Sequence, residues 1–164
     1  MIMERKVFPS NIRWAKVEEW EPAMKMIWRT FLRFEAADYS QEGIQNFLDF
    51  ITDEKLFHAF LRGEYQMMVA LDEGKVVGAA SVRNRNHLSL LFVDEPYHKR
   101  GIGRQLLNQF CYYLEKEEGE RCMSVKAAPY AVGFYRKVGF RAIGPEEEVG
   151  GIRVTPMEKH FEKG

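Results

Sequence analysis

The chain has 164 residues, a length that fits one domain, 1–164, able to bury a single sizeable core. Its residues are 46% hydrophobic, 13% aromatic and 29% charged, which argues against a disordered chain and is typical of a globular protein. The 24 basic and 24 acidic residues cancel, so the composition argues against a dedicated nucleic-acid-binding protein, which would normally present a net basic surface.

The first third of the chain is predicted to be mostly helical. A short strand, 11–16, precedes a helix that begins near Pro22, since proline is favoured in the first helical turn. Apolar residues of this helix recur at i, i+3, i+4 and i+7, the spacing of one buried face: Met24, Ile27, Trp28 and Phe31. Ser40 is expected to cap a second helix with the same spacing, and Thr52 to cap a third helix over 53–62.

From residue 65 the periodicity changes to that of strands. Two strands, 65–71 and 75–83, flank the turn-forming triplet 72–74 and predict a hairpin, and a third strand follows over 87–93. An amphipathic helix, a strand, a short helix and a final strand pair are expected after these, at about 102–114, 121–127, 130–138, 140–143 and 151–157. The acidic run 146–148 is interpreted as the solvated tip of that last pair.

Cysteine content and apolar run lengths bear on the compartment. Cys111 and Cys122 are too few for a disulfide framework, so both are expected to be reduced. Residues 1–9 contain no apolar run of signal-peptide length, and no stretch approaches the ~20 apolar residues of a membrane-spanning helix. The sequence therefore predicts a cytoplasmic protein without a membrane partner.

The most informative segment joins the strand 87–93, through a proline turn and a basic glycine loop, to an amphipathic helix. Gly101 and Gly103 fall at or near the first helical turn, where backbone amides have no intrahelical acceptor. Those amides and the helix dipole favour an anion, and glycine lets a pyrophosphate approach the backbone closely. Three neighbouring side chains add positive charge: Lys99, Arg100 and Arg104. The segment therefore predicts a site for a phosphorylated ligand.

Spacing tests two other glycine-loop interpretations. A P-loop requires the string Gly-x-x-x-x-Gly-Lys-Ser/Thr, which is not present in this sequence. A dinucleotide fingerprint requires a third glycine where Leu106 stands. Both nucleotide interpretations are therefore poor.

Two motifs resemble those of one enzyme family. The string His98-Lys99-Arg100-Gly101-Ile102-Gly103 resembles the Gln/Arg-x-x-Gly-x-Gly/Ala acyl-CoA loop of the GNAT superfamily of N-acetyltransferases. The string from Ala131 to Phe140 resembles the Ala-x-x-x-Tyr-x-x-x-Gly-Phe signature that follows strand five in these enzymes. The resemblance extends over roughly 66–161, and weakly to the predicted strand 11–16. This chain departs from the family pattern at His98, usually Gln or Arg, and at Ala128, often Asn.

The resemblance implies a fold, an activity and a cofactor. The fold is an α/β fold of the α+β type, in which helices flank a central mixed, mostly antiparallel sheet whose strands four and five are splayed to admit the pantetheine arm. The activity is N-acyltransfer of an acetyl or other short acyl group from acetyl-CoA to a primary amine, by direct attack in a ternary complex. A homodimer is common among similar proteins. The implied CoA-binding residues are Leu91, Phe92, Val93, His98, Lys99, Arg100, Gly101, Ile102, Gly103 and Arg104.

Tyr135 and His87 are the catalytic candidates. Tyr135 matches the family tyrosine that protonates the CoA sulfur, whereas the ordinary alternative is a half-buried packing residue. The register of His87 resembles the place where some members carry a glutamate base, and a neutral imidazole suits proton abstraction near neutral pH. A water chain as the base, with a structural role for His87, is the alternative.

Acceptor-binding candidates come from the region between the first two helices, which covers the substrate side in the family. Asp38, Tyr39 and Glu42 lie there, and solvated residues or helix caps are the alternative. Aromatic residues of the first helix line either the acceptor pocket or the core: Trp28, Phe31 and Phe34. The histidines His58, His98 and His160 show no metal-ligand pattern with either cysteine, so no metal is expected.

A different class of function stays open at this point. A non-catalytic acyl-CoA-binding sensor or interaction module is favoured by the departures at His98 and Ala128, whereas Tyr135 favours catalysis. A third interpretation is a small fold that uses its aromatic helices only for oligomerisation, but it gives the basic glycine loop no function.

Overall fold

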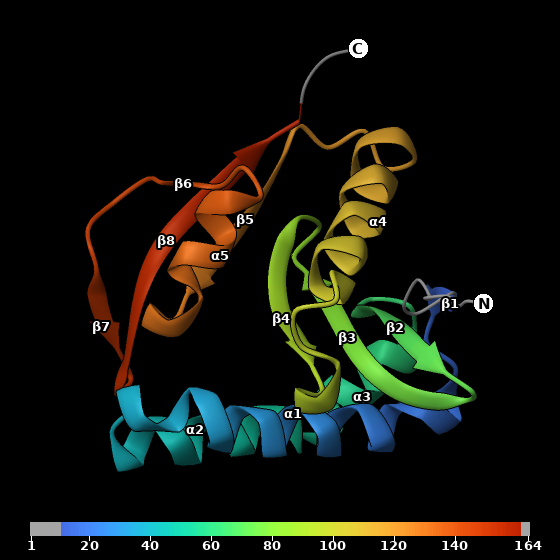
Figure 1. The fold of residues 1–164 in the computed structure, drawn as a ribbon, viewed down its shortest axis with the longest axis horizontal. Coiled ribbons are helices and arrows are strands. Elements are labelled where there is room, and N and C mark those ends of the chain that lie inside the picture. The colour runs from blue at the N-terminus through green and yellow to red at the C-terminus, as the bar shows by residue number, and fades with distance from the viewer. Residues whose placement is uncertain (1–10, 162–164) are drawn as a thin grey trace, which may run out of the picture.

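The computed structural model describes residues 11–161, so the segment 1–9 considered for a leader lies outside the described residues. One mixed sheet carries helices on both faces, which confirms the predicted α/β class (Figure 1). The strands are β1 Asn11–Trp14, β2 Gln66–Asp72, β3 Lys75–Arg83, β4 His87–Val93, β5 Cys122–Ala127, β6 Arg141–Ala142, β7 Glu147–Val149 and β8 Ile152–His160. The α-helices are α1 Trp20–Phe34, α2 Gln41–Ile51, α3 Glu54–Leu61, α4 Ile102–Lys116 and α5 Val132–Lys137. Short 3₁₀ turns are η1 Val17–Glu19, η2 Ala36–Asp38, η3 Glu95–Tyr97 and η4 Pro129–Ala131.

The sheet parts between β4 and β5. Its order is β1-β2-β3-β4-β5-β8-β6, with β7 paired to β8, and every pairing is antiparallel except β4 with β5. These two parallel strands pair only at His87 with Ser124 and at Leu88 with Val125. Beyond Leu88, β4 pairs with β3 alone, and β5 pairs with β8 alone. The splay between strands four and five that the resemblance implies is therefore confirmed, and the gap widens toward α1 and α2 (Figure 1).

Each face of the sheet has its own apolar core. In β2 the side chains of Met68 and Ala70 pack on the face covered by α4, whereas those of Met67 and Val69 pack on the face covered by α1. Successive side chains of a strand point to opposite faces, so a strand buried on both faces is apolar almost without interruption. The continuous apolar runs of β2 and β3 have this origin.

One of the two predicted helix caps is confirmed and the other is wrong. The Ser40 hydroxyl accepts from the amide of Gly43 at 3.0 Å and caps α2. The cap of α3 is Asp53, whose carboxylate accepts from the amide of Lys55 at 2.9 Å. The Thr52 hydroxyl instead donates to the carbonyl of Leu48 at 2.7 Å and ends the preceding helix. Two adjacent capping residues serve two adjacent helix ends.

The interpretation of 146–148 as a hairpin tip is wrong. Glu147–Val149 forms the edge strand β7, which pairs with the first half of β8. The turn lies at Gly150 and Gly151, whose φ angles of 58° and 82° are in the left-handed region that glycine adopts without strain. Two glycines are therefore the stronger turn signal, and the acidic side chains lie on an exposed edge.

The β7–β8 turn also holds the region between α1 and α2. The Ser40 amide donates to the carbonyl of Gly151 at 3.0 Å, and the Asn46 side chain donates to the carbonyl of Gly150 at 3.1 Å. A Cβ atom on Gly43 would lie 2.5 Å from the Gly151 carbonyl oxygen, so this approach requires glycine. These contacts join the helical layer to the β5–β8 side of the parted sheet.

None of the helices within residues 11–161 is long and apolar enough to cross a membrane. Both cysteines have free thiols, and Cys111 is buried on the apolar face of α4, as the apolar spacing predicted.

Candidate functional site

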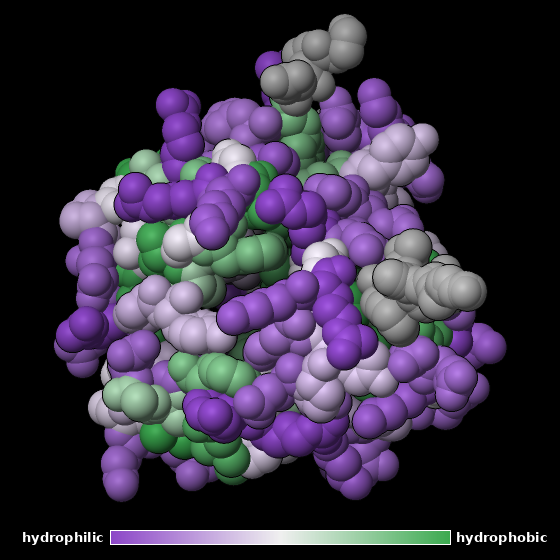
Figure 2. All heavy atoms as spheres, viewed as in Figure 1, coloured by the Kyte–Doolittle hydropathy of each residue, from purple (hydrophilic) through white to green (hydrophobic). Residues whose placement is uncertain are grey.

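A cavity of about 590 Å³ lies where β4 and β5 separate. Its walls come from the end of α1, from 91–93 in β4, from the loop that leads into α4, and from η4 with α5. Figure 2 shows apolar surface over α5 and over the α1–α2 layer below it, surrounded by hydrophilic side chains. The opening therefore suits a ligand with an apolar middle and a polar end.

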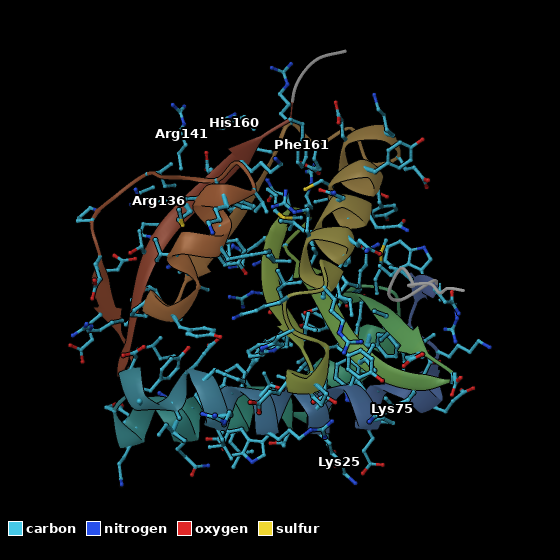
Figure 3. All side chains as sticks on the ribbon, in the orientation of Figure 1. Lys25, Lys75, Arg136, Arg141, His160 and Phe161 are labelled. Carbon is cyan, nitrogen blue, oxygen red and sulfur yellow. The ribbon has the colours of Figure 1, made fainter. Side chains whose placement is uncertain are left out.

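A second hollow lies at the other end of α1. It has a volume of about 570 Å³ and includes Lys25 and Lys75, which lie beside α1 and β3 away from α5 (Figure 3). Acidic side chains line it as well, among them Glu18 and Glu21, so its charges balance. The cavity between β4 and β5 is the better candidate because it combines apolar walls with polar groups at one end.

The glycine loop opens α4 as predicted. Lys99 and Gly101 have φ angles of 65° and 83°, and the first amide to bond back into the helix is that of Gln105, which donates to Gly101 at 2.9 Å. The amides of residues 102–104 precede it and have no acceptor in the helix. The Ile102 side chain is only 1% exposed and packs in the core, so only its backbone can take part in binding.

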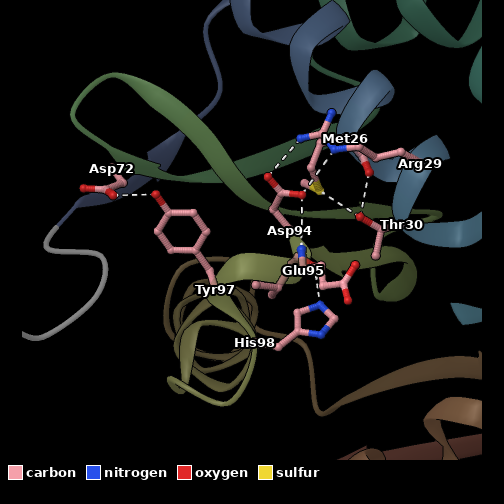
Figure 4. A network of polar contacts seen from close by, with 9 residues as sticks. Met26, Arg29, Thr30, Asp72, Asp94, Glu95, Tyr97 and His98 are labelled. Atoms are coloured by element: carbon pink, nitrogen blue, oxygen red, sulfur yellow. Dashed lines mark hydrogen bonds and ion pairs between the residues drawn. The ribbon is translucent and has the colours of Figure 1, made fainter. Parts of the chain in front are cut away.

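His98 and Phe34 close one wall of the cavity. The His98 imidazole donates from Nε2 to the carbonyl of Val93 at 2.6 Å, which fixes the ring at the end of β4 (Figure 4). The Phe34 ring lies 4.9 Å from that imidazole and stacks 5.5 Å from the ring of Tyr130. Phe34 therefore spans the gap between the two halves of the sheet.

Tyr135 reaches the cavity from α5. Its side chain is 6% exposed and its ring packs edge-on against Phe134 and Phe140, with centroid distances of 5.3 and 5.2 Å. Burial raises the pKa of the Tyr135 hydroxyl above its ordinary value, and the charge of Glu35 raises it further. The hydroxyl therefore keeps its proton at neutral pH.

Glu35 is the carboxylate among the cavity residues that the sequence analysis missed. It ends α1 half-buried in the cavity wall, with its amide donating to the carbonyl of Phe31 at 2.8 Å. Burial, followed by the charge of Asp38, raises the pKa of its carboxyl to about 7. A signal was present in the sequence: Glu35 lies four residues after buried Phe31, where the apolar stripe of the helix would continue.

The structure does not bring His87 to the cavity. It lies at the other end of β4, where β4 and β5 still pair, and its Nδ1 lies 2.8 Å from the Ser124 hydroxyl. Burial, followed by the charges of Arg83 and Lys126, lowers the pKa of His87 to about 4, so the ring is neutral near pH 7.

The acceptor candidates are also placed elsewhere. Asp38 and Glu42 are exposed, Tyr39 packs against Phe31, and none of the three lines the cavity, although the charge of Asp38 acts on Glu35. Of the three aromatic residues of α1, Phe34 lines the cavity, whereas Trp28 and Phe31 stack on each other at 5.6 Å and pack in the core. Within residues 11–161, no three His, Cys, Asp or Glu side chains are grouped as metal ligands.

An ion pair fixes α1 against the end of β4. The Asp94 carboxylate is buried, and it accepts from Arg29 Nε at 3.2 Å, from Arg29 Nη2 at 2.9 Å and from the Glu95 amide at 3.1 Å (Figure 4). Nearby, the Tyr97 hydroxyl donates to Asp72 at 2.6 Å and holds the start of the loop against the β2–β3 hairpin (Figure 4). Both contacts join segments that line or support the cavity.

Comparison with known proteins agrees with this geometry. The family description "Acetyltransferase (GNAT) domain" matches residues 35–161. A Bacillus subtilis (strain 168) protein, named "Putative acetyltransferase BSU40680", is 30% identical over 112 residues, which cover 66% of this chain and 76% of the relative.

Solved structures share the fold. A GCN5-related N-acetyltransferase from Rhodopseudomonas palustris aligns with a TM-score of 0.80 at 24% identity, over 96% of this chain and 100% of the other. The PaiA N-acetyltransferase from Thermoplasma acidophilum, in complex with coenzyme A, aligns with a TM-score of 0.77 at 22% identity, over 92% of this chain and 98% of that enzyme. The family match covers most of the chain, both of its motifs and the parted sheet, and the chain therefore belongs to the GNAT family of acetyltransferases.

Proposed function

We propose that this protein moves an acetyl group from acetyl-CoA to a primary amine by direct attack in a ternary complex. The observation that carries the proposal is the cavity between the parted strands, which has the free amides of α4 beside it and Tyr135 in its wall. Solved relatives of the same fold hold coenzyme A, among them the Thermoplasma acidophilum PaiA enzyme and an aminoglycoside 6'-N-acetyltransferase.

Each part of the donor has a matching part of the site. The diphosphate is proposed to lie against the backbone amides of 101–104, with Lys99, Arg100 and Arg104 supplying positive charge. The pantetheine arm is proposed to run along 91–93, which have no partner on the β5 side. The mostly apolar walls fit that arm, and the thioester would then lie near Tyr135.

The reaction needs a neutral amine, a polarised carbonyl and a proton for the leaving thiolate. Unpaired backbone amides of β4 are proposed to bond the developing oxyanion, and Tyr135 to protonate the sulfur. Neither Cys111 nor Cys122 is among the described residues that line the cavity, which supports direct attack of the amine on the thioester. His87 has no part in this scheme because it lies at the closed end of the strand pair.

The diphosphate position can be tested at Gly101 with two variants of equal size. Asp and Asn both tolerate the left-handed backbone of this residue, and a Cβ atom there would meet only Gln105, at 3.9 Å. Gly101→Asp places a negative charge beside the diphosphate, so we expect it to bind CoA about 10–100-fold more weakly than Gly101→Asn. Isothermal titration calorimetry measures both affinities, and equal values would place the diphosphate elsewhere.

The activity itself is tested with purified protein, acetyl-CoA and a panel of primary amines, with free thiol as the readout. We expect thiol release that depends on the amine, together with an acetylated product seen by mass spectrometry. Thermal stabilisation by CoA without turnover on any amine would instead support a non-catalytic sensor.

A further inference from the structure

Glu35 is a carboxylate in an otherwise mostly apolar wall. It lies in the same cavity as Tyr135, next to Phe34 and opposite α5. Within residues 11–161 no cation or hydrogen-bond donor pairs with its carboxylate, although buried carboxylates in proteins are normally paired. A half-buried charge without a partner destabilises the fold, so its presence here points to a partner supplied by a ligand.

Among the described side chains that line this cavity, Glu35 is the carboxylate, the group that can both attract an ammonium cation and accept its proton. The side chains that face it or act on it are Asp38, Tyr39, His98, Lys99, Tyr135 and Lys137. Tyr135 keeps its proton. His98 donates from Nε2 to the Val93 carbonyl, which leaves Nδ1 as a second acceptor, but the imidazole has no negative charge to hold an ammonium cation. Lys99 and Lys137 are cations on the loop and on α5, the sides proposed for the donor. A carboxylate whose pKa is about 7 is ionised in a large fraction of molecules near neutral pH and can still take up a proton.

We propose that Glu35 binds the acceptor amine as an ammonium cation and removes one proton from it before attack. This inference rests on the proposed acetyl transfer and adds the group that makes the amine a nucleophile. It also sets the substrate class: the acceptor arrives charged, as most primary amines are near neutral pH.

The proton and electron balance is complete with the groups in the cavity. The ammonium group gives one proton to Glu35, and the nitrogen lone pair then forms a bond to the thioester carbon. The carbon–sulfur bond breaks, and the sulfur takes the hydroxyl proton of Tyr135. The second proton on the nitrogen returns to Tyr135, and Glu35 releases its proton to solvent. The products are the acetylated amine and CoA with a free thiol.

The pH dependence of kcat/KM distinguishes this role from a structural one. With Glu35 as the base, kcat/KM falls as pH decreases through about 7, because protonated Glu35 cannot accept the proton. In Glu35→Gln only the small fraction of free amine can react, so we expect this limb to move to the amine's own pKa, about 10 for an aliphatic amine. The value of kcat/KM at pH 7 should decrease about 10²-fold or more.

Three further variants sharpen the test. Glu35→Asp should retain the limb near neutral pH with reduced kcat, since it keeps a carboxylate on a shorter side chain. Asp38→Asn should shift the limb to lower pH without removing it, because the charge of Asp38 raises the pKa of Glu35. Glu21→Gln, on the exposed first turn of α1, should leave the profile unchanged.

Binding of acetyl-CoA, measured by calorimetry, separates the possible failures. We expect Glu35→Gln to bind acetyl-CoA as the wild type does, and loss of that binding would overturn the base role. An unchanged pH profile and rate in Glu35→Gln would also overturn it, while leaving acetyl transfer established by the wild-type turnover. No turnover of any amine by the wild type would reject the proposed function, and the role of Glu35 with it.

Discussion

Tyr135→Phe is expected to lower kcat by about 10²–10⁴-fold while leaving acetyl-CoA affinity nearly unchanged. The variant removes one hydroxyl from a ring that packs between Phe134 and Phe140, so the apolar contacts of α5 remain. In the wild type, the raised pKa of the Tyr135 hydroxyl makes it a weak acid, so we expect it to give up its proton only as negative charge develops on the sulfur. Steady-state kinetics and calorimetric titration with acetyl-CoA provide the two measurements.

Tyr130→Phe is the matched control for this variant. Tyr130 lines the same cavity, and its ring stacks on Phe34, but it is 54% exposed and lies in η4 outside the second sequence motif. We expect its loss of a hydroxyl to change kcat by less than about tenfold. If both variants retained wild-type turnover, the proton for the thiolate would come from solvent, and the assignment of Tyr135 as the acid would be wrong.

Arg29→Met is expected to reduce the free energy of unfolding by about 3 kcal/mol, which corresponds to a decrease in Tm of roughly 6–12 °C. The Asp94 side chain is 6% exposed, and the variant leaves its charge buried with the Glu95 amide as the one donor that the described residues still supply. This expected loss of stability lies at the lower end of the range for broken buried ion pairs because the Arg29 side chain is 54% exposed. Methionine keeps a long side chain and a good helix propensity, so the change isolates the ion pair.

Arg33→Met tests the same substitution one helical turn later. Arg33 pairs with Glu95 at 3.6 Å, and both side chains are largely exposed, at 65% and 52%. Exposed ion pairs contribute little to stability. We therefore expect Arg33→Met to reduce the free energy of unfolding by less than about 1 kcal/mol, a figure that includes the lost contact of Arg33 with the Phe34 ring. Urea unfolding followed by circular dichroism measures both variants. If Arg29→Met and Arg33→Met lost equal amounts of stability, the buried ion pair would have no special role and the apolar face of α1 alone would hold the helix in place.

The ion pair also connects stability to the site. Arg29 lies six residues before Glu35 on α1, and Asp94 directly follows the β4 segment that lines the cavity. The pair therefore sets where the end of α1 lies relative to β4. A variant that loosens it should reduce turnover through the position of Glu35 and leave the α4 loop intact.

Local signals were sufficient for most of the helices and strands. The start of α4 at Ile102 follows from two glycines before an apolar stripe, and the β2–β3 hairpin follows from the turn triplet between two apolar runs. The cap at Ser40 was predicted for the same reason. The cap at Asp53 was not predicted, because Thr52 and Asp53 are adjacent and both are capping residue types. The strand β7 was not predicted either, because only its pairing with β8 in the folded chain makes the acidic segment a strand.

The position of His87 could not be derived from its strand. Its residue type and its place in the strand were correctly identified, but whether it reaches the cavity depends on where β4 and β5 part. That point is set by pairing with β3 on one side and β8 on the other, and both pairings join residues far apart in the sequence. Glu35 was missed for the complementary reason, since a single acidic residue at a helix end is ordinary until α1 is placed across the opening.

The amino-acid sequence by itself determined the fold class, the family and the glycine loop that opens α4, because each depends on the order and spacing of neighbouring residues. Only the tertiary structure decided which side chains share the cavity. Contacts such as Arg29 with Asp94, 65 residues apart, and Asn46 with Gly150, 104 residues apart, position the helical layer over the parted strands. The physical reason is that a side chain's chemistry follows from its burial and its neighbours, and both are properties of the folded chain.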